Sequence, residues 1–250
     1  MATLTIDIGN HRVKLALISN CEEIVRREHF LTSEISGQKD SIIEMVDEND
    51  TDGIVIGSVV PDATKEFLKA LSGYDPLVVT GKTPCGLSID YDPIETLGAD
   101  RLAAATGAFR EYGEVINCAI MVVDAGSTVT ADLISSSGAY HGGSIFPGER
   151  LALISLSDGA EQLPMIAFNP HQVVIGSSTI ECILVGVKAT IIGAIEHLYH
   201  RYGEIHGENP FVIITGASAS WIAPELSIPH MVDPDVVLFG LAAIWSYNNE

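Results

Sequence analysis

The chain has 250 residues, of which 47% are hydrophobic and 18% are charged. This composition is typical of a globular protein and excludes a disordered one, and the length suffices for one large domain or two small ones. Only 13 Lys and Arg residues face 33 Asp and Glu residues, which gives a formal net charge of −20. Nucleic acids and anionic lipid surfaces are bound through an excess of basic residues, so this balance predicts no nucleic-acid partner and no membrane partner.

The cysteines and the first residues predict a cytoplasmic protein. Cys21, Cys85, Cys118 and Cys182 are scattered without a CxxC pair, as reduced thiols usually are. The first ten residues have the pattern of a strand and a turn rather than of a secretory signal. Apolar runs such as 119–123 are much shorter than a membrane span, so we expect no membrane-spanning segment.

The first half of the chain alternates strand and helix patterns. Residues 4–8 alternate in polarity and lead into a turn at Gly9-Asn10, after which residues 13–18 resume as a strand. The later predicted elements of this half are a helix at 41–46, a strand at 53–60, a helix at 63–71, a strand at 77–79 and an Ala-rich helix at 101–112.

The second half begins in the same way. A strand at 119–124 runs into Ala125-Gly126-Ser127 and returns as a strand at 129–134. The later predicted elements are a helix at 180–202 with Gly186 and Gly193 as close-packing points, a strand at 211–215 and a helix at 236–247. Two halves that begin alike indicate a duplication with its boundary near Gly113. We therefore predict an α/β protein with two lobes, residues 1–112 and 113–250, and a cleft between them; one continuous sheet is the alternative.

Two Asp-x-Gly turns carry the predicted chemistry, Asp7-Ile8-Gly9-Asn10 and Asp124-Ala125-Gly126-Ser127. Glycine at such a turn lets a phosphate approach backbone amides without a Cβ in the way. The carboxylate can hold a cation, or a water bound to one, that neutralises the phosphates. Lys14, on the returning strand, is placed to reach a terminal phosphate. One such turn is common hairpin chemistry, but two at equivalent strand ends favour an ATP-dependent small-molecule kinase.

Gly81-Lys82-Thr83 has the ending of a P-loop, but Pro76 stands where that motif requires its first glycine. The segment is therefore predicted to be a surface loop rather than a nucleotide site.

Asp100 and Arg101 precede an apolar helix, and two interpretations of them stay open. An Asp at this place is a good helix N-cap. Alternatively, its carboxylate takes a hydroxyl proton while the guanidinium grips a substrate carboxylate in bidentate fashion.

Taken in order, these segments resemble the type III pantothenate kinase family. The resemblance rests on both Asp-x-Gly turns with Lys14, on Tyr91 seven residues before Gly98-Ala99-Asp100-Arg101, on Gly142-Gly143 with Pro147-Gly148, and on Ser178-Thr179 before a helix. It covers residues 7 to about 216.

The resemblance implies an actin/Hsp70/sugar-kinase-like fold with two duplicated ribonuclease-H-like lobes and ATP between them. The first lobe would carry the first phosphate loop and the acceptor site, and the second lobe the second phosphate loop and the adenosine region. The implied reaction transfers the γ-phosphate of ATP to pantothenate and gives 4′-phosphopantothenate, the first step of coenzyme A biosynthesis. The family also implies Mg²⁺, a monovalent cation (K⁺ or NH₄⁺) and a homodimer whose subunits complete the substrate site.

The resemblance also assigns roles to individual positions. Asp100 would be the general base, and Asp124 would ligate the monovalent cation. The ATP-binding residues would be Asp7, Ile8, Gly9, Asn10, His11, Arg12, Val13, Lys14 and Ser127. The pantothenate-binding residues would be Tyr91, Gly98, Ala99, Asp100, Arg101 and Thr179.

Three positions depart from the family pattern. His11 and Ser127 each replace a Thr, and Thr215-Gly216-Ala217-Ser218 replaces Thr-Gly-Gly-Asp near the adenosine. The imidazole of His11 can donate a hydrogen bond to phosphate or point to solvent. Two alternatives therefore stay open: an accessory or regulatory protein that binds nucleotide or pantothenate without turnover, and a kinase for another small hydroxy acid or a sugar.

Overall fold

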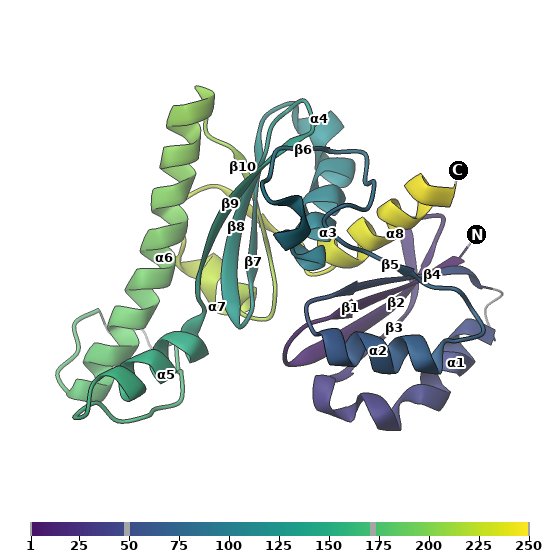
Figure 1. The fold of residues 1–250 in the computed structure, drawn as a ribbon. Helices are drawn as coiled ribbons and strands as arrows, with labels where there is room; N and C mark the ends of the chain where they lie inside the picture. The colour runs from purple at the N-terminus through teal and green to yellow at the C-terminus, as the bar shows by residue number, and fades with distance from the viewer. Residues whose placement is uncertain (1, 48–50, 171–173, 250) are drawn as a thin grey trace. The chain divides into compact units, whose positions relative to one another are not determined.

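The computed structural model describes residues 2–47, 51–170 and 174–249 (Figure 1). The chain divides into two compact units, each described by itself below. Unit 1 comprises Met1–Asn117, Ile134–Gly142 and Asp235–Glu250, and unit 2 comprises Cys118–Leu133 and Gly143–Pro234. The units differ from the lobes expected at 1–112 and 113–250 because two later segments, 134–142 and 235–250, belong to unit 1. The lobe boundaries themselves stay a prediction.

Unit 1 is built on a sheet with the strand order β3-β2-β1-β4-β5 among the described residues (Figure 1). Strand β1 is central, antiparallel to β2 and parallel to β4. Leu4, Thr5 and Ile6 of β1, which point alternately to the two faces of the sheet, are all 0% exposed, as expected for a strand covered on both faces. The bounds are β1 Ala2–Ile8, β2 Arg12–Ser19, β3 Glu23–Leu31, β4 Thr51–Ser58 and β5 Leu77–Val78.

Helices cover both faces of this sheet. One apolar cluster joins β1 to α1 and α2 through residues such as Ile6, Ile42 and Phe67. Another joins Ala16 and Ile18 of β2 to α8. The helix bounds are α1 Lys39–Asp47, α2 Pro61–Ala70, α3 Ala99–Ala108, α4 Glu114–Ile116 and α8 Val236–Asn249.

Helices α3 and α8 meet backbone to backbone. A Cβ on Gly107 of α3 would lie 2.0 Å from the carbonyl oxygen of Val236, and one on Gly240 of α8 would lie 1.8 Å from that of Ala103. Only glycine fits at either position. This contact fixes α3, whose first turn carries Asp100 and Arg101, against a buried helix.

Unit 2 contains most of a second sheet, with the strand order β11-β10-β7-β8-β9-β6 among the described residues. Strand β10 is parallel to β7, with Thr215 opposite Asp124. Strands β8 and β9 each run from one unit into the other, and β6 pairs with the part of β9 that belongs to unit 1. The bounds are β6 Ser88–Ile89, β7 Ile120–Ala125, β8 Thr128–Ile134, β9 Ala139–Pro147, β10 Phe211–Thr215 and β11 His230–Val232.

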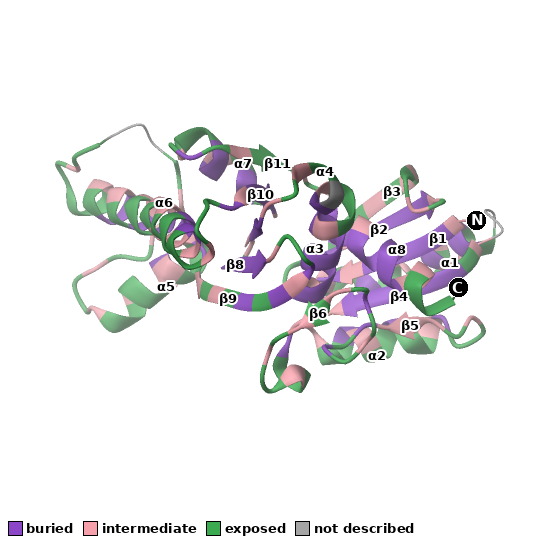
Figure 2. Cartoon of the chain, turned by 90° about the horizontal axis from the view of Figure 1, so that it is seen from above, coloured by how far each residue is buried: buried purple, intermediate pink, exposed green. Residues whose placement is uncertain are grey.

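The long helix α6 supplies one side of the unit 2 core, which Figure 2 shows as buried residues along β8, β10 and α6. The Ser178 hydroxyl caps its start by accepting a hydrogen bond from the Glu181 N–H, and Gly207 ends it in the left-handed region with φ +81°. The helices of this unit are α5 Glu149–Gly159, α6 Thr179–His206 and α7 Ala219–Ile222.

Most predicted elements are confirmed, and the differences have physical reasons. Strands β3, β6, β9 and β11 and helices α4, α5 and α7 were not predicted. Most of these elements are short, the charged sequence of β3 has a largely solvent-facing pattern, and α5 has a single fully buried side chain. The expected packing role of Gly186 and Gly193 is wrong, since no heavy atom of the described part of the chain lies within 4 Å of a Cβ placed at either. Within the described ranges no helix has the length and apolar character needed to cross a membrane.

Candidate functional site

The first Asp-x-Gly turn joins β1 to β2 in unit 1. The Gly9 N–H donates to the Arg12 carbonyl oxygen at 3.0 Å, and the Thr32 hydroxyl donates to the Gly9 carbonyl oxygen at 2.7 Å. These bonds fix the backbone of the turn while the side chains of residues 10–12 are exposed. The turn therefore combines a rigid backbone with an open tip, which suits contact between its amides and a ligand.

Lys14 lies directly opposite Asp7 across the β1–β2 ladder. Residues opposite each other in an antiparallel pair have their side chains on the same face, so Asp7 and Lys14 extend from the same face of the sheet. Ile8 and Val13, also predicted at the ATP site, are at most 1% exposed and belong to the core. Only their backbone groups are available to a nucleotide.

Asp100 lies inside the first turn of α3, so of its two interpretations the N-cap is wrong. The N-cap is Gly98, with extended backbone angles, and Asp100 is the second helical residue. Its Oδ1 accepts a hydrogen bond from the Arg101 N–H at 2.8 Å. A Cβ on Gly98 would lie 2.5 Å from that same oxygen, so a side chain at this position would displace the carboxylate from its present orientation.

The structure brings Arg101 and Tyr91 into contact. The Arg101 Nη1 donates to the Tyr91 hydroxyl at 3.2 Å, and its Cζ lies 5.4 Å from the centre of the Tyr91 ring. Tyr91 packs in turn against Tyr140, with ring centres 6.1 Å apart, and closely against Gly142. Arg101 is only 6% exposed, so these contacts hold a largely buried guanidinium in one orientation.

The second Asp-x-Gly turn joins β7 to β8 in unit 2 and is braced from two sides. On one side, the Gly148 N–H donates to the Ser127 carbonyl oxygen at 3.1 Å. On the other, the Ser218 N–H donates to the Ala125 carbonyl oxygen at 2.9 Å. Gly216 has φ +90°, and a Cβ there would lie 2.5 Å from the Asp124 Oδ1.

The structure adds a residue to this region that the sequence analysis did not predict. The Ser218 hydroxyl donates to the Oε1 of Glu149 at 2.7 Å. Glu149 is the first residue of α5 and directly follows the bracing Gly148. No local pattern could have found this bond, because it joins residues 69 positions apart.

Thr179 is the first residue of α6 and belongs to unit 2, whereas Tyr91 and residues 98–101 belong to unit 1. It is exposed and lines a cavity of about 550 Å³. The other walls of the cavity are mostly apolar and come from α5, α6 and the segments beside them: Pro147, Ala152, Ser155, Leu156, Leu163, Cys182, Ile183, Gly186, Val187, Thr190 and Ile191.

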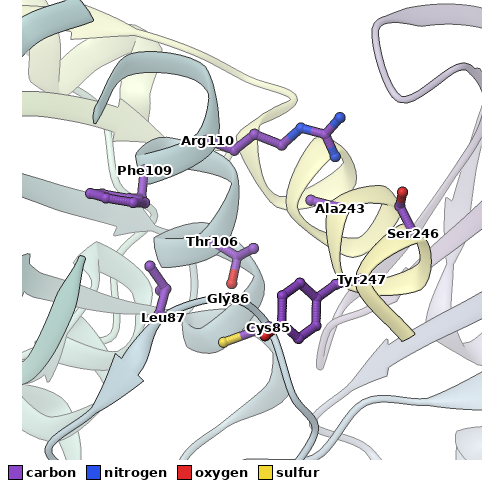
Figure 3. Close-up of a pocket in the computed structure, with 9 residues that line it drawn as sticks. All are labelled: Cys85, Gly86, Leu87, Thr106, Phe109, Arg110, Ala243, Ser246 and Tyr247. Carbon is purple, nitrogen blue, oxygen red and sulfur yellow. The ribbon is translucent and has the colours of Figure 1, made fainter. Parts of the chain in front are cut away.

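Unit 1 holds a smaller pocket, of about 270 Å³, between α8, α3 with the π-helical turn that follows it, and residues 85–87 (Figure 3). Its walls are Cys85, Gly86, Leu87, Thr106, Phe109, Arg110, Ala243, Ser246 and Tyr247. None of the predicted site residues lines it.

Gly81-Lys82-Thr83 lies in a turn, as predicted. The Lys82 ammonium group pairs with the Glu95 carboxylate at 2.6 Å, and this hydrogen bond lowers the pKa of the exposed Glu95.

Comparison with known proteins identifies the family. The profile of the type III pantothenate kinases matches residues 3–201 of this chain. The chain belongs to the type III pantothenate kinase family. Its relatives include type III pantothenate kinases of Roseiflexus castenholzii, 32% identical over 99% of both chains, and of Porphyromonas gingivalis, 33% identical over 98% of both.

Solved structures confirm the predicted fold class of this kinase-family chain. A protein from Campylobacter jejuni named as a Baf family transcriptional activator aligns with a TM-score of 0.64 at 21% identity over 98% of both chains. A ROK family glucokinase from Streptomyces griseus aligns with a TM-score of 0.56 at 12% identity over 99% of both. These likenesses establish the actin/Hsp70/sugar-kinase-like fold and nothing about substrate.

Proposed function

We propose that this protein transfers the γ-phosphate of ATP to the primary hydroxyl of pantothenate, the first step of coenzyme A biosynthesis. The observation that carries the proposal is the start of α3, where Gly98 leaves room for the Asp100 carboxylate and Tyr91 holds the Arg101 guanidinium. A carboxylate and a fixed guanidinium on neighbouring residues suit an acceptor that has both a hydroxyl and a carboxylate.

In this proposal Asp100 is the general base and Arg101 orients the acceptor. The Arg101 N–H fixes the Asp100 Oδ1, so the carboxylate has a defined direction in which to accept the hydroxyl proton. The guanidinium would bind the pantothenate carboxylate, helped by Tyr91 and the backbone of Gly98 and Ala99. Phosphoryl transfer passes through a loose transition state, so positioning and charge neutralisation supply most of the rate acceleration.

ATP would be held by the two Asp-x-Gly turns, through residues 7–14 and Ser127. Lys14 would neutralise a terminal phosphate, and His11 would offer a ring N–H at the exposed tip of the first turn. Among the described residues no three His, Cys, Asp or Glu side chains form a metal-binding group. In this proposal Mg²⁺ would be held mainly by phosphate oxygens with one or two carboxylates, and Asp124 would ligate the monovalent cation. When bound, these cations neutralise the charge of the phosphates.

We further propose that the protein is a cytoplasmic homodimer in which a second copy completes the substrate site near Thr179. Val174 and Ile175 are each 84% exposed, and Met165 and Ile180 are at least half exposed. Several exposed apolar side chains within one stretch of chain, 165–180, favour a protein interface there. Light scattering should therefore give twice the chain mass, and Ile175→Glu should give the monomer with weaker pantothenate binding.

The experiment that tests the proposed reaction is turnover with a panel of acceptors, followed by Asp100→Asn. Phosphorylated pantothenate should form, and the substitution should lower kcat by about 10²–10⁴-fold, as for other general bases. Asp62→Asn is the matched control, since Asp62 is the second residue of α2 as Asp100 is of α3. Turnover of another hydroxy acid or a sugar, or nucleotide binding without ADP release, would replace the proposal with the corresponding alternative.

A further inference from the structure

Glu149 occupies an unusual place in unit 2. It follows Gly148, which has no room for a side chain because a Cβ there would lie 2.4 Å from the Gly126 carbonyl oxygen. Backbone contact with the second Asp-x-Gly turn therefore fixes where the Glu149 side chain begins. As the first residue of α5, Glu149 also lies where the helix dipole favours a negative charge.

The Glu149 side chain links the two segments that hydrogen-bond to that turn. Its Oε1 accepts the hydrogen bond from the Ser218 hydroxyl, and Ser218 is itself only 5% exposed. Ser218 is tied by its N–H to the Ala125 carbonyl oxygen, and Gly148 is tied to Ser127. The segments on either side of the proposed nucleotide turn, Gly148 and residues 215–218, are thus joined to each other by one carboxylate.

Burying this carboxylate lowers the free energy of unfolding. Among the described residues, neither the Glu149 Oε2 nor the Thr215 hydroxyl has a hydrogen-bond partner, and both atoms are buried. An unsatisfied buried acceptor destabilises the folded state, and an apolar pair of the same shape would be tolerated at least as well. Locally unfavourable features of this kind persist mainly at functional sites.

We propose that Glu149 is a positioning residue of the nucleotide site. Its bond to Ser218 holds residues 215–218 against the Asp124–Ser127 turn, so that the site is formed before the nucleotide arrives. The inference rests on the proposed function, because it takes this turn to be a nucleotide turn. Preorganisation of this kind raises affinity by reducing the ordering that binding requires.

The test compares ADP affinity, measured by calorimetry with Mg²⁺, with the melting temperature of the same variants. Glu149→Ala should weaken ADP binding about 10–100-fold, the range typical of residues that orient a site. At saturating ATP its kcat should stay within about threefold of the unsubstituted protein, because the residue acts on binding and not on the reacting atoms. Glu149→Gln should keep ADP affinity within about threefold, since the amide oxygen still accepts from Ser218.

The double variant Glu149→Met with Ser218→Ala separates positioning from a merely structural role. It removes both polar partners, so it should melt at or above the temperature of the unsubstituted protein while binding ADP as weakly as Glu149→Ala. Glu196→Ala is the matched control, because Glu196 also accepts one hydrogen bond from a serine, the Ser227 N–H at 2.7 Å, and it should change neither quantity.

Two results would overturn the inference. One is ADP affinity within twofold of the unsubstituted protein in both Glu149→Ala and the double variant. The other is a double variant that loses stability together with binding, which would make the Glu149–Ser218 pair a structural bond. If the unsubstituted protein bound no ADP, the proposed function would fail and this inference with it.

Discussion

The two Asp-x-Gly turns begin alike, but the protein stabilises them in different ways. In the first, the Gly9 N–H reaches the carbonyl oxygen of Arg12, and in the second the Gly126 N–H reaches that of Thr128, so the second turn is one residue shorter. The first has Lys14 across the ladder from its Asp. Seven residues after Asp124 the chain has Ala131, and the carboxylate of Glu149 lies beside the turn instead.

From this difference we infer that the two turns bind different parts of the nucleotide. A turn with an open tip and a lysine suits the terminal phosphates, which carry most of the charge. A short turn braced by glycines and a carboxylate suits the less charged part of the nucleotide and a cation. Repeated motifs therefore do not imply repeated roles, because the segments that pack around each turn set its electrostatics.

Among substitutions that distinguish the two turns, those of Asp7 and Asp124 should have the largest effect on the kinetics. Asp7→Asn should lower kcat/KM by about 10²–10³-fold at every potassium concentration, because it removes a charge that organises the phosphates and their Mg²⁺. Asp124→Asn should mainly raise the potassium concentration needed for half-maximal rate. Steady-state kinetics over a potassium series checks this, and equal potassium curves for both variants would contradict the division.

Substitution of Lys14, which has no counterpart at the second turn, should have the next largest effect, on the KM for ATP. Lys14→Ala should raise the KM for ATP about 10–100-fold, since a hydrogen bond between charged groups is lost. Lys69→Ala, in the last turn of α2, is the matched control and should leave KM unchanged. A Lys14 variant with normal KM would remove the main chemical contrast between the two turns.

Substitutions of Gly216 and Gly9 should differ in their effect on the free energy of unfolding rather than on the reaction rate. Gly216→Ala places a side chain at φ +90° and against Asp124, so it should lower the free energy of unfolding by about 1–3 kcal/mol. At Gly9 the nearest atom to a Cβ is the Arg12 carbonyl oxygen at 3.2 Å, and Gly9→Ala should cost less than about 1 kcal/mol. Urea unfolding of both variants measures the contrast, and a reversed order would show that the second turn is the looser one.

The smallest effect is expected at the segment that only looks like a phosphate loop. Lys82→Ala should change the KM for ATP by less than about twofold, because Lys82 forms an exposed pair with Glu95. The pair holds the pKa of Glu95 below its ordinary value, so any stabilisation is present above that ordinary pKa and is lost as pH falls through the lowered one. Thermal melts of the unsubstituted protein and of Lys82→Ala should therefore differ only at neutral pH and should coincide at acid pH, where Glu95 is protonated and the pair is lost.

The sequence predicts local features of the site well and distant ones poorly. Both Asp-x-Gly turns could be found because strand, glycine and returning strand are adjacent in the chain. The role of Asp100 depended on where α3 begins, and a shift of two residues turned an expected N-cap into a carboxylate of the first turn. The Glu149–Ser218 bond depends on how separate segments pack, for which a single sequence has no local pattern.

The same limit applies to the fold. The buried strands β1 and β7 were predicted from their apolar patterns, but α5 was not, because it packs through a narrow face. Membership of α8 in unit 1 could not be predicted either, since that helix is buried nearly all round and has no polar face to orient it.

The most direct test of the central claim is ADP release with pantothenate, measured with and without potassium and combined with mass detection of the product. The proposed function predicts one 4′-phosphopantothenate for each ADP, a rate that rises with potassium, and the loss of both products in Asp100→Asn. ADP release that is independent of pantothenate, or nucleotide binding with no product, would contradict it.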